Sequence, residues 1–486
     1  MRISVALMFS DVAEHDEQVT ISMMRISRWK KRAAILAVGL AAAAVVPAAT
    51  STSPVASAQT SIGPGGEFFS VTPARILDTR EPANDVAPLG EKRSDADGEV
   101  FSLKVTGRDG VPDDNVLAVA VSIIAIRPDG AGFLTARPAG SAASSPTSLV
   151  NFPSAGSSVA NLGIIGVGNN GEIDIELTTP FVTGDMHVVV DLYGWIATSG
   201  YDDVDDVGAR VRPLTPERLA DTRNAGQLPP AMSSPRRINA GESIELPVVG
   251  VGSVPNSDSV TGVVVNLTAI NPTGASFLSL SPERPTGPIA TSNGNYRPGE
   301  VRATVAIVPV GPDGSIWLTA GPSPVHAAID VVGYLERGAA SSTDAGRVVP
   351  LEAPFRSFDT RLAEFGSVRL GPSQWEDWSF TRFSESVELD GVTNIAQQGF
   401  FGNLTGFSLQ NAPGTYLTFN PREPQAFSSA PGNSSLNLAG SQVITNNMML
   451  VSYGSNGAGD DAVVSAFNAA GSVHYILDIF AVVLDD

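Results

Sequence analysis

The chain has 486 residues, a formal net charge of −20 at pH 7, 48 glycines, 35 prolines and no cysteine. At roughly 100 to 200 residues per domain, this length predicts about three domains. The acidic charge argues against nucleic acid and anionic membrane as partners, because both are bound through clustered cationic side chains. The lack of cysteine excludes disulfides, thiolate nucleophiles and cysteine-ligated metal sites.

Residues 23–58 have the three parts of a secretory signal peptide: a basic stretch, the apolar run 33–46, and Ala56-Ser57-Ala58 before Gln59. The apolar run is shorter than the about 20 residues that span a bilayer core, so we expect no transmembrane anchor. Residues 1–22 are a doubtful leader, since they carry acidic residues upstream of the basic stretch. We expect translation to begin at Met23 or Met24, and the product to be secreted, extracellular or loosely held at the cell surface.

A block of six residues recurs at domain-sized spacing, as RILDTR at 75–80, RLADTR at 218–223 and RSFDTR at 356–361. Each copy is followed by a closing segment, which reads HVVVDLYG at 187–194, HAAIDVVG at 326–333 and HYILDIFA at 474–481. A solenoid repeat spans only about 20 to 50 residues, so each copy should be a complete domain. We expect repeat units at 67–198, 207–337 and 346–486, the third being divergent.

Within each unit the apolar runs are short, rich in β-branched residues and separated by Gly, Pro, Asn and Asp. Residues 100–106 alternate, 117–126 are apolar except for Ser122, and 301–310 end at the turn sequence GPDG. These patterns predict an all-β fold of three tandem antiparallel β-sandwich domains, jelly-roll-like with about eight to ten strands each. They predict almost no helix after the signal peptide. They do not decide between a sandwich and a barrel.

Three motifs together resemble a tandem repeat of secreted and cell-surface actinobacterial proteins: PxRxxDTR at 73–80 and 216–223, VVVNLTAINP at 263–272 and IDVVGY at 329–334. The resemblance covers nearly all of the mature chain and implies an accessory module without established activity, sometimes joined to hydrolase domains. The second unit matches best. The third has Phe355 before its arginine and Ala481 in place of the closing glycine, which puts any ligand site shared by the repeats in doubt there.

Each closing segment places an aspartate in a strand that is apolar on both sides, and a buried carboxylate needs a cationic partner or several hydrogen bonds. The recurring block supplies the only arginines common to all three units, and a guanidinium can bind a carboxylate through two parallel hydrogen bonds. We therefore predict an internal clasp that joins the first and last strands of each unit, with a surface ligand site as the alternative. Its candidate residues are Arg75, Asp78, Arg80 and Asp191; Arg218, Asp221, Arg223 and Asp330; and Arg356, Asp359, Arg361 and Asp478.

The histidines His187, His326 and His474 each lie four residues before one of these aspartates. A catalytic or metal couple is disfavoured, because side chains four apart on a strand are about 13 Å from each other. The acidic stretch 95–99 superficially resembles a calcium loop and 202–206 could bind calcium weakly, but a plain turn and a solvated linker are the favoured interpretations. The sequence therefore predicts no cofactor and no metal.

No catalytic motif stands out, and repeated units are typical of binding modules that gain from avidity. We predict a non-catalytic surface or extracellular-matrix protein that binds or adheres to polysaccharide or protein of the cell envelope or surroundings. The alternative is a secreted, carboxylate-based glycoside hydrolase. Trp375 and Trp378, in the third unit, are the residues to check for stacking on a sugar, although core or edge packing is the favoured interpretation. Asn266 and Asn403 match a glycosylation pattern but fall at strand positions, so we set them aside.

Overall fold

The computed structural model describes residues 65–80, 100–141, 147–156, 158–178, 186–199, 201, 207–338, 343–380, 396–408, 413–425, 427–440 and 444–486. The leader, the signal peptide and the acidic stretches 95–99 and 202–206 lie outside the described residues. Val55–Asp486 belong to one compact unit. Within the described ranges, no helix has both the length and the apolar character needed to cross a membrane.

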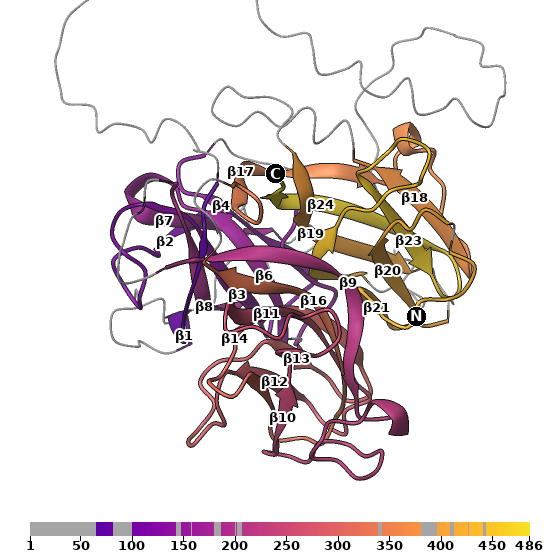
Figure 1. Cartoon of the computed structure of the whole chain (residues 1–486), viewed down its shortest axis with the longest axis horizontal. Helices are drawn as coiled ribbons and strands as arrows, with labels where there is room; N and C mark the ends of the chain where they lie inside the picture. Colours follow the sequence, from indigo (N-terminus) through magenta and orange to yellow (C-terminus); the bar gives the residue numbers. More distant parts are fainter. Residues whose placement is uncertain are drawn as a thin grey trace, which may run out of the picture. The chain divides into compact units, whose positions relative to one another are not determined.

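The described strands fall into three sets of eight, one per repeat, which we call sandwiches 1, 2 and 3 and which Figure 1 colours from indigo to yellow. Sandwich 1 holds β1 (Phe68–Asp78), β2 (Val100–Lys104), β3 (Val116–Ile126), β4 (Gly132–Pro138), β5 (Val150–Phe152), β6 (Ser158–Gly166), β7 (Glu172–Thr178) and β8 (His187–Ala197). Sandwich 2 holds β9 (Ala209–Asp221), β10 (Ser243–Pro247), β11 (Val260–Ile270), β12 (Ser276–Ser281), β13 (Gly294–Tyr296), β14 (Val301–Pro309), β15 (Ser315–Ala320) and β16 (His326–Arg337). Sandwich 3 holds β17 (Val348–Asp359), β18 (Gln374–Ser379), β19 (Gln397–Ser408), β20 (Thr415–Pro421), β21 (Leu436–Leu438), β22 (Ile444–Ser452), β23 (Val463–Asn468) and β24 (Val473–Leu484). The helical segments among the described residues are single 3-10 turns: η2 (Asn169–Gly171), η3 (Ala225–Gln227) and η4 (Ala363–Phe365).

All three sandwiches have the same strand order. In sandwich 1 the inner sheet runs β1-β8-β3-β6 and the outer sheet β2-β7-β4-β5, and the corresponding strands of sandwiches 2 and 3 follow the same two orders. The strand pairs are antiparallel, and this interleaving of early and late strands over two sheets is the jelly-roll topology. The prediction of an all-β, jelly-roll-like sandwich fold is confirmed, and the strand order decides for sandwich over barrel.

The first strands of the three sandwiches meet at one place. Phe68 of β1 pairs with Ala209 of β9, and Gly66 forms an isolated bridge with Val348 of β17. Arg210 is buried there; its Nε donates to Glu67 at 2.8 Å, and its Nη1 donates to the backbone carbonyls of residues 343 and 345. The repeats are therefore in direct contact where each one begins.

The inner sheets are covered on both faces. One face packs on the outer sheet of the same sandwich, and the other contributes to a hydrophobic cluster that includes Ile164 of sandwich 1, Ile307 of sandwich 2 and Leu450 of sandwich 3. All of β3 except its last residue is buried, whereas β2 in the outer sheet alternates between buried and exposed residues. This explains why 117–126 is apolar apart from Ser122: a strand covered on both faces has no solvent side.

Candidate functional site: the repeated arginine–aspartate pairs and the seams

Each sandwich pairs a buried aspartate on its last strand with an arginine on its first strand. Arg75 lies opposite Asp191 in the register of β1 and β8, and its Nε and Nη2 donate to the two carboxylate oxygens at 2.8 and 3.1 Å. The same two-bond pairing recurs between Arg218 and Asp330 at 2.5 and 3.5 Å, and between Arg356 and Asp478 at 2.9 and 3.1 Å. Asp191 has no exposed surface. These bonds join the first strand of each sandwich to its last strand.

The second arginine of each block binds within its own turn. Arg80 donates from Nε and Nη2 to Asp78 at 2.9 and 2.7 Å, and its backbone N–H donates to the same carboxylate. Arg223 with Asp221 and Arg361 with Asp359 repeat this arrangement. The first arginine also reaches this aspartate, at 3.0 Å between Arg218 and Asp221. Two arginines and two aspartates thus alternate in one charge-balanced cluster.

The two aspartates of a cluster have opposite pKa shifts. Burial raises the pKa of Asp191, Asp330 and Asp478, and the hydrogen bonds from their arginines offset only part of this effect. Burial also opposes ionisation of the turn aspartates, but the side-chain and backbone hydrogen bonds from the second arginine outweigh it. The pKa values of Asp78, Asp221 and Asp359 are therefore lowered.

The recurring histidines contact the threonine of the block and not the aspartate. Thr79 Oγ1 accepts the backbone N–H of Val188 at 2.9 Å and lies 3.1 Å from His187 Nδ1. The equivalent distances are 3.0 Å from Thr222 to His326 and 3.2 Å from Thr360 to His474. Burial, together with nearby arginines, lowers the pKa of His326 and His474, which favours the neutral ring. These histidines tie the turn to the last strand.

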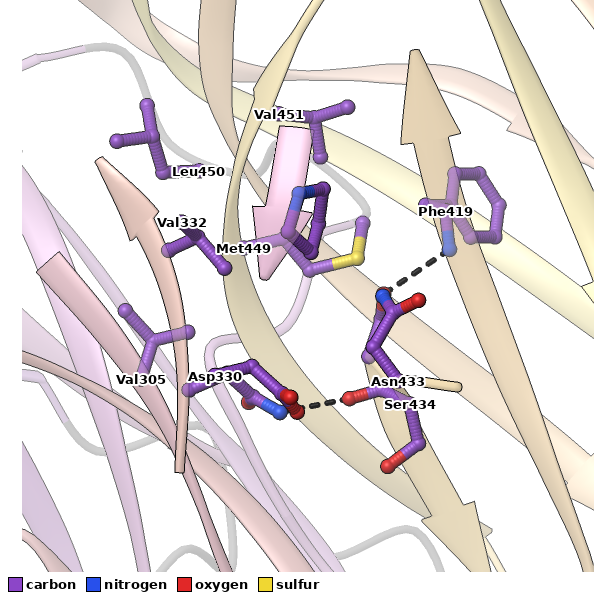
Figure 2. A pocket seen from close by; sticks show the side chains of 12 residues that line it. Val305, Asp330, Val332, Phe419, Asn433, Ser434, Met449, Leu450 and Val451 are labelled. Atoms are coloured by element: carbon purple, nitrogen blue, oxygen red, sulfur yellow. Dashed lines mark hydrogen bonds between the residues drawn. The ribbon is translucent and has the colours of Figure 1, made fainter. Parts of the chain in front are cut away.

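The buried aspartates also lie at the seams, our term for the contacts between neighbouring sandwiches. The backbone N–H of Ser292 in sandwich 2 bonds Asp191 of sandwich 1, and that of Ser148 in sandwich 1 bonds Asp478 of sandwich 3. In the seam between sandwiches 2 and 3, Asp330 lies beside Ser434, where both line a water-sized cavity of about 10 Å³ (Figure 2). Each sandwich therefore presents its aspartate to a serine of the next one in a closed cycle.

Buried asparagines connect the sandwiches beside these aspartates. In the seam between sandwiches 2 and 3, Asn266 donates to the Ser434 carbonyl at 2.6 Å, and Asn447 donates to Asn266 at 2.9 Å. Asn447 Oδ1 in turn accepts the backbone N–H of Val305 at 3.0 Å. The seam between sandwiches 3 and 1 has the same set of bonds. Asn403 donates to the Ser148 carbonyl, Asn161 donates to Asn403, and Asn161 Oδ1 accepts the backbone N–H of Met448.

These bonds satisfy the free edges of the inner sheets. β6, β14 and β22 are edge strands that contact one another, and an edge strand has backbone groups without a partner in its own sheet. Asn161 and Asn447 supply the missing acceptors for the neighbouring edge. In the seam between sandwiches 1 and 2, Ser122 and Thr304 occupy the asparagine positions, and the Tyr193 hydroxyl donates to the Ser292 carbonyl instead.

The asparagines were not among the residues that the sequence singled out as a site. A signal was present, because Asn266 and Asn403 occupy the same repeat position, and each lies opposite the buried aspartate in the strand register. Both are buried, at 4% and 0% exposure, and their amides bond protein groups. They hold the seams together.

The two candidate tryptophans differ. Trp378 packs in the core: it is 5% exposed, stacks on Phe358 at 4.2 Å and donates to the Tyr475 hydroxyl at 2.8 Å. It lies on the core face of β18, as the favoured interpretation expects. Trp375, three residues earlier, points to the opposite face, is half-buried and stacks on Phe427 at 4.4 Å.

A larger cavity, of about 190 Å³, opens at the seam between sandwiches 2 and 3 and is lined by Arg218 and Arg223 on one side and Tyr416 and Asn437 on the other. The part of the chain that the structure describes holds no group of three or more His, Cys, Asp or Glu side chains placed to bind a metal ion.

No family model matches the sequence. No curated protein matches it either. Among solved structures, one described as the triple jelly roll fold and turret assembly in an archaeal virus aligns over 86% of this chain and 91% of its own, at 8% identity and a TM-score of 0.15. A score this low carries no argument about fold or function, so the jelly-roll assignment rests on the strand order.

Proposed function

We propose that this protein is a secreted, non-catalytic surface or extracellular-matrix protein whose jelly-roll repeats form a binding or adhesion module for polysaccharide. The polar residues common to all three repeats support this proposal, because they bond one another inside the chain. The first strand of each sandwich and the turn after it are bonded to the last strand by four such residues, which in sandwich 1 are Arg75, Asp191, Thr79 and His187. Their recurrence therefore has a structural cause, and binding is expected where the repeats differ.

The observation that carries the proposal is a row of aromatic rings on the outward face of the outer sheet of sandwich 3. Tyr416 lies 6.0 Å from Phe467, Phe467 lies 4.8 Å from Trp375, and Trp375 stacks on Phe427 at 4.4 Å, measured between ring centroids. Phe467 is buried beneath its neighbours, whereas the other three rings are half-buried. Rings that reach the surface in a row can stack on the apolar faces of successive sugars.

Sandwiches 1 and 2 lack this row. The strand register places Glu176 and Thr319 where sandwich 3 has Phe467. It places Val100 and Ser243 where sandwich 3 has Trp375. A difference confined to the outward face of one repeat does not serve the shared fold, so a ligand is the simplest reason for it.

Retention on insoluble polysaccharide tests the proposal. The protein is mixed with cellulose, chitin or isolated bacterial cell walls, and the bound fraction is measured after washing. Trp375→Ala should lose most of the retention, whereas Trp317→Ala, which removes a half-buried tryptophan from the outer sheet of sandwich 2, should not. Equal retention of both variants would contradict the proposal. Release of reducing sugar over time would favour the glycoside hydrolase instead.

A further inference from the structure

The cavity of about 190 Å³ between sandwiches 2 and 3 has a built polar lining. Sandwich 2 contributes Arg223, Thr268 and Ala328 to its wall, and sandwich 3 contributes Tyr416 and Asn437. A binding site here would therefore exist only when the two sandwiches are packed together.

The space arises from small side chains at one repeat position. Ala328 lies opposite Thr268 in the strand register, and the corresponding residues are Val189 in sandwich 1 and Ile476 in sandwich 3. Ile270, which also lines the cavity, corresponds to Phe407 in sandwich 3. Ile476 and Phe407 are larger, so the same fold accepts side chains that would fill this space.

Two donors in the wall lack partners. Thr268 is 3% exposed, and among the described residues nothing hydrogen-bonds its hydroxyl. The hydroxyl oxygen has less than 1 Å² of accessible surface, so the Thr268 side chain must turn toward the cavity for a ligand to bond it. A buried hydroxyl without a partner costs about 1–3 kcal/mol, so such a bond adds affinity. Arg223 uses Nε and Nη2 for Asp221, while its Nη1 makes no hydrogen bond within the described ranges and its side chain is 48% exposed.

The lining is charge-balanced, because Arg218 and Arg223 face the carboxylates of Asp221 and Asp330. A neutral ligand suits such a wall better than an anion does. The ring of Tyr416 adds an apolar surface beside the polar groups. The volume is below the about 300–1,000 Å³ of drug-sized sites and equals roughly six water volumes, which suits one small ring.

We propose that this cavity binds a single neutral sugar ring, held by the Thr268 hydroxyl, Arg223 Nη1 and the Asn437 amide and packed against Tyr416. The inference rests on the proposed function, since it names where one unit of a polysaccharide is recognised. Tyr416 is also the first ring of the aromatic row that leads to Trp375. The cavity and the row are thus parts of one continuous surface.

Binding of soluble methyl glycosides of glucose, galactose and mannose tests the cavity separately from the polysaccharide. Affinity is measured by calorimetry, and crystals are soaked with the glycoside that binds best. Ala328→Ile fills the cavity with the side chain that sandwich 3 has at this position, and Thr268→Val removes only the hydroxyl. Thr405→Val is the matched control, because Thr405 is the counterpart of Thr268 in sandwich 3 and its hydroxyl is also unpartnered among the described residues.

At least one glycoside should bind, with density in the cavity. Ala328→Ile should lower the affinity by at least about tenfold and Thr268→Val by roughly 3- to 10-fold, while Thr405→Val and the melting temperatures stay near wild type. The inference is overturned if no glycoside binds, if folded Ala328→Ile binds normally, or if inorganic phosphate binds better than every glycoside. Retention on polysaccharide without glycoside in the cavity would overturn this inference alone. Glycoside in the cavity without retention would overturn only the proposed function.

Discussion

Replacing Asp478 by alanine should destabilise the protein more than replacing Asp330, although both aspartates have the same place in their sandwiches. Asp478 is fully buried and binds Arg356 through two hydrogen bonds of 2.9 and 3.1 Å. Once it is removed, the nearest carboxylate to Arg356 is Asp359, at 3.8 Å. Among the described residues, Arg356, whose side chain is 20% exposed, would then keep only that long contact with a carboxylate.

The magnitudes follow from what each arginine retains. Breaking a buried ion pair by removing one partner costs about 3–5 kcal/mol, and Asp478→Ala should fall in that range. Arg218 in the Asp330→Ala variant keeps Asp221 at 3.0 Å and the Gly432 carbonyl at 2.7 Å. These two bonds should limit the loss to about 2–3 kcal/mol.

Urea unfolding, followed by tryptophan fluorescence and far-ultraviolet circular dichroism, measures both losses. Trp195 reports on sandwich 1, Trp317 on sandwich 2 and Trp378 on sandwich 3. Because side chains of all three sandwiches share one hydrophobic cluster, we expect the signals to change in a single transition.

Three results would refute this reasoning. Equal losses for the two variants would show that the retained bonds of Arg218 are worth little. A loss below about 1 kcal/mol for Asp478→Ala would place the pair among weak surface ion pairs. A separate early transition of sandwich 2 in Asp330→Ala would show that the seams do not couple the sandwiches.

Three further predictions concern the seams and the turns. Asn447→Ala should lower the free energy of unfolding in urea by about 1–3 kcal/mol, because it leaves the Val305 N–H without its acceptor. Ser122→Ala should change it by no more than about 0.5 kcal/mol, since among the described residues that hydroxyl has no partner. Equal effects of the two variants would argue against the asparagine network. The pKa of Asp221 in the folded protein is below its unfolded value of 3.8. Its contribution to folding stability is therefore complete above pH 3.8 and is lost as the pH falls through the pKa of the folded state. Asp221→Asn should therefore reduce the fall in melting temperature as the pH is lowered below about 3.8. An unchanged fall would count against this assignment. The pKa of His474 is below its unfolded value of 6.5, so stability should fall as the pH drops below about 6.5, and His474→Gln should reduce that slope in the same melts.

Much of the fold could be predicted from local chemistry. Alternating and unbroken apolar runs of strand length, punctuated by turn residues, are sufficient for an all-β sandwich. The pairing of Asp191 with an arginine of the recurring block followed from the cost of burying a carboxylate in an apolar strand, since few cations recur with it. The sequence did not decide between Arg218 and Arg223 as the partner of Asp330. The tertiary structure shows Arg218, because Arg223 is held by Asp221 within the turn.

The seams were decided only by tertiary structure. Asn447 meets Asn266 from another repeat, and Ala328 leaves a cavity only because Tyr416 of sandwich 3 closes its other side. Periodicity reports whether a strand face is covered, as the nearly continuous apolar run in β3 does, but it does not report what covers it. Which edge meets which depends on how whole sandwiches pack against one another, and that packing is a sum over many contacts far apart in the chain.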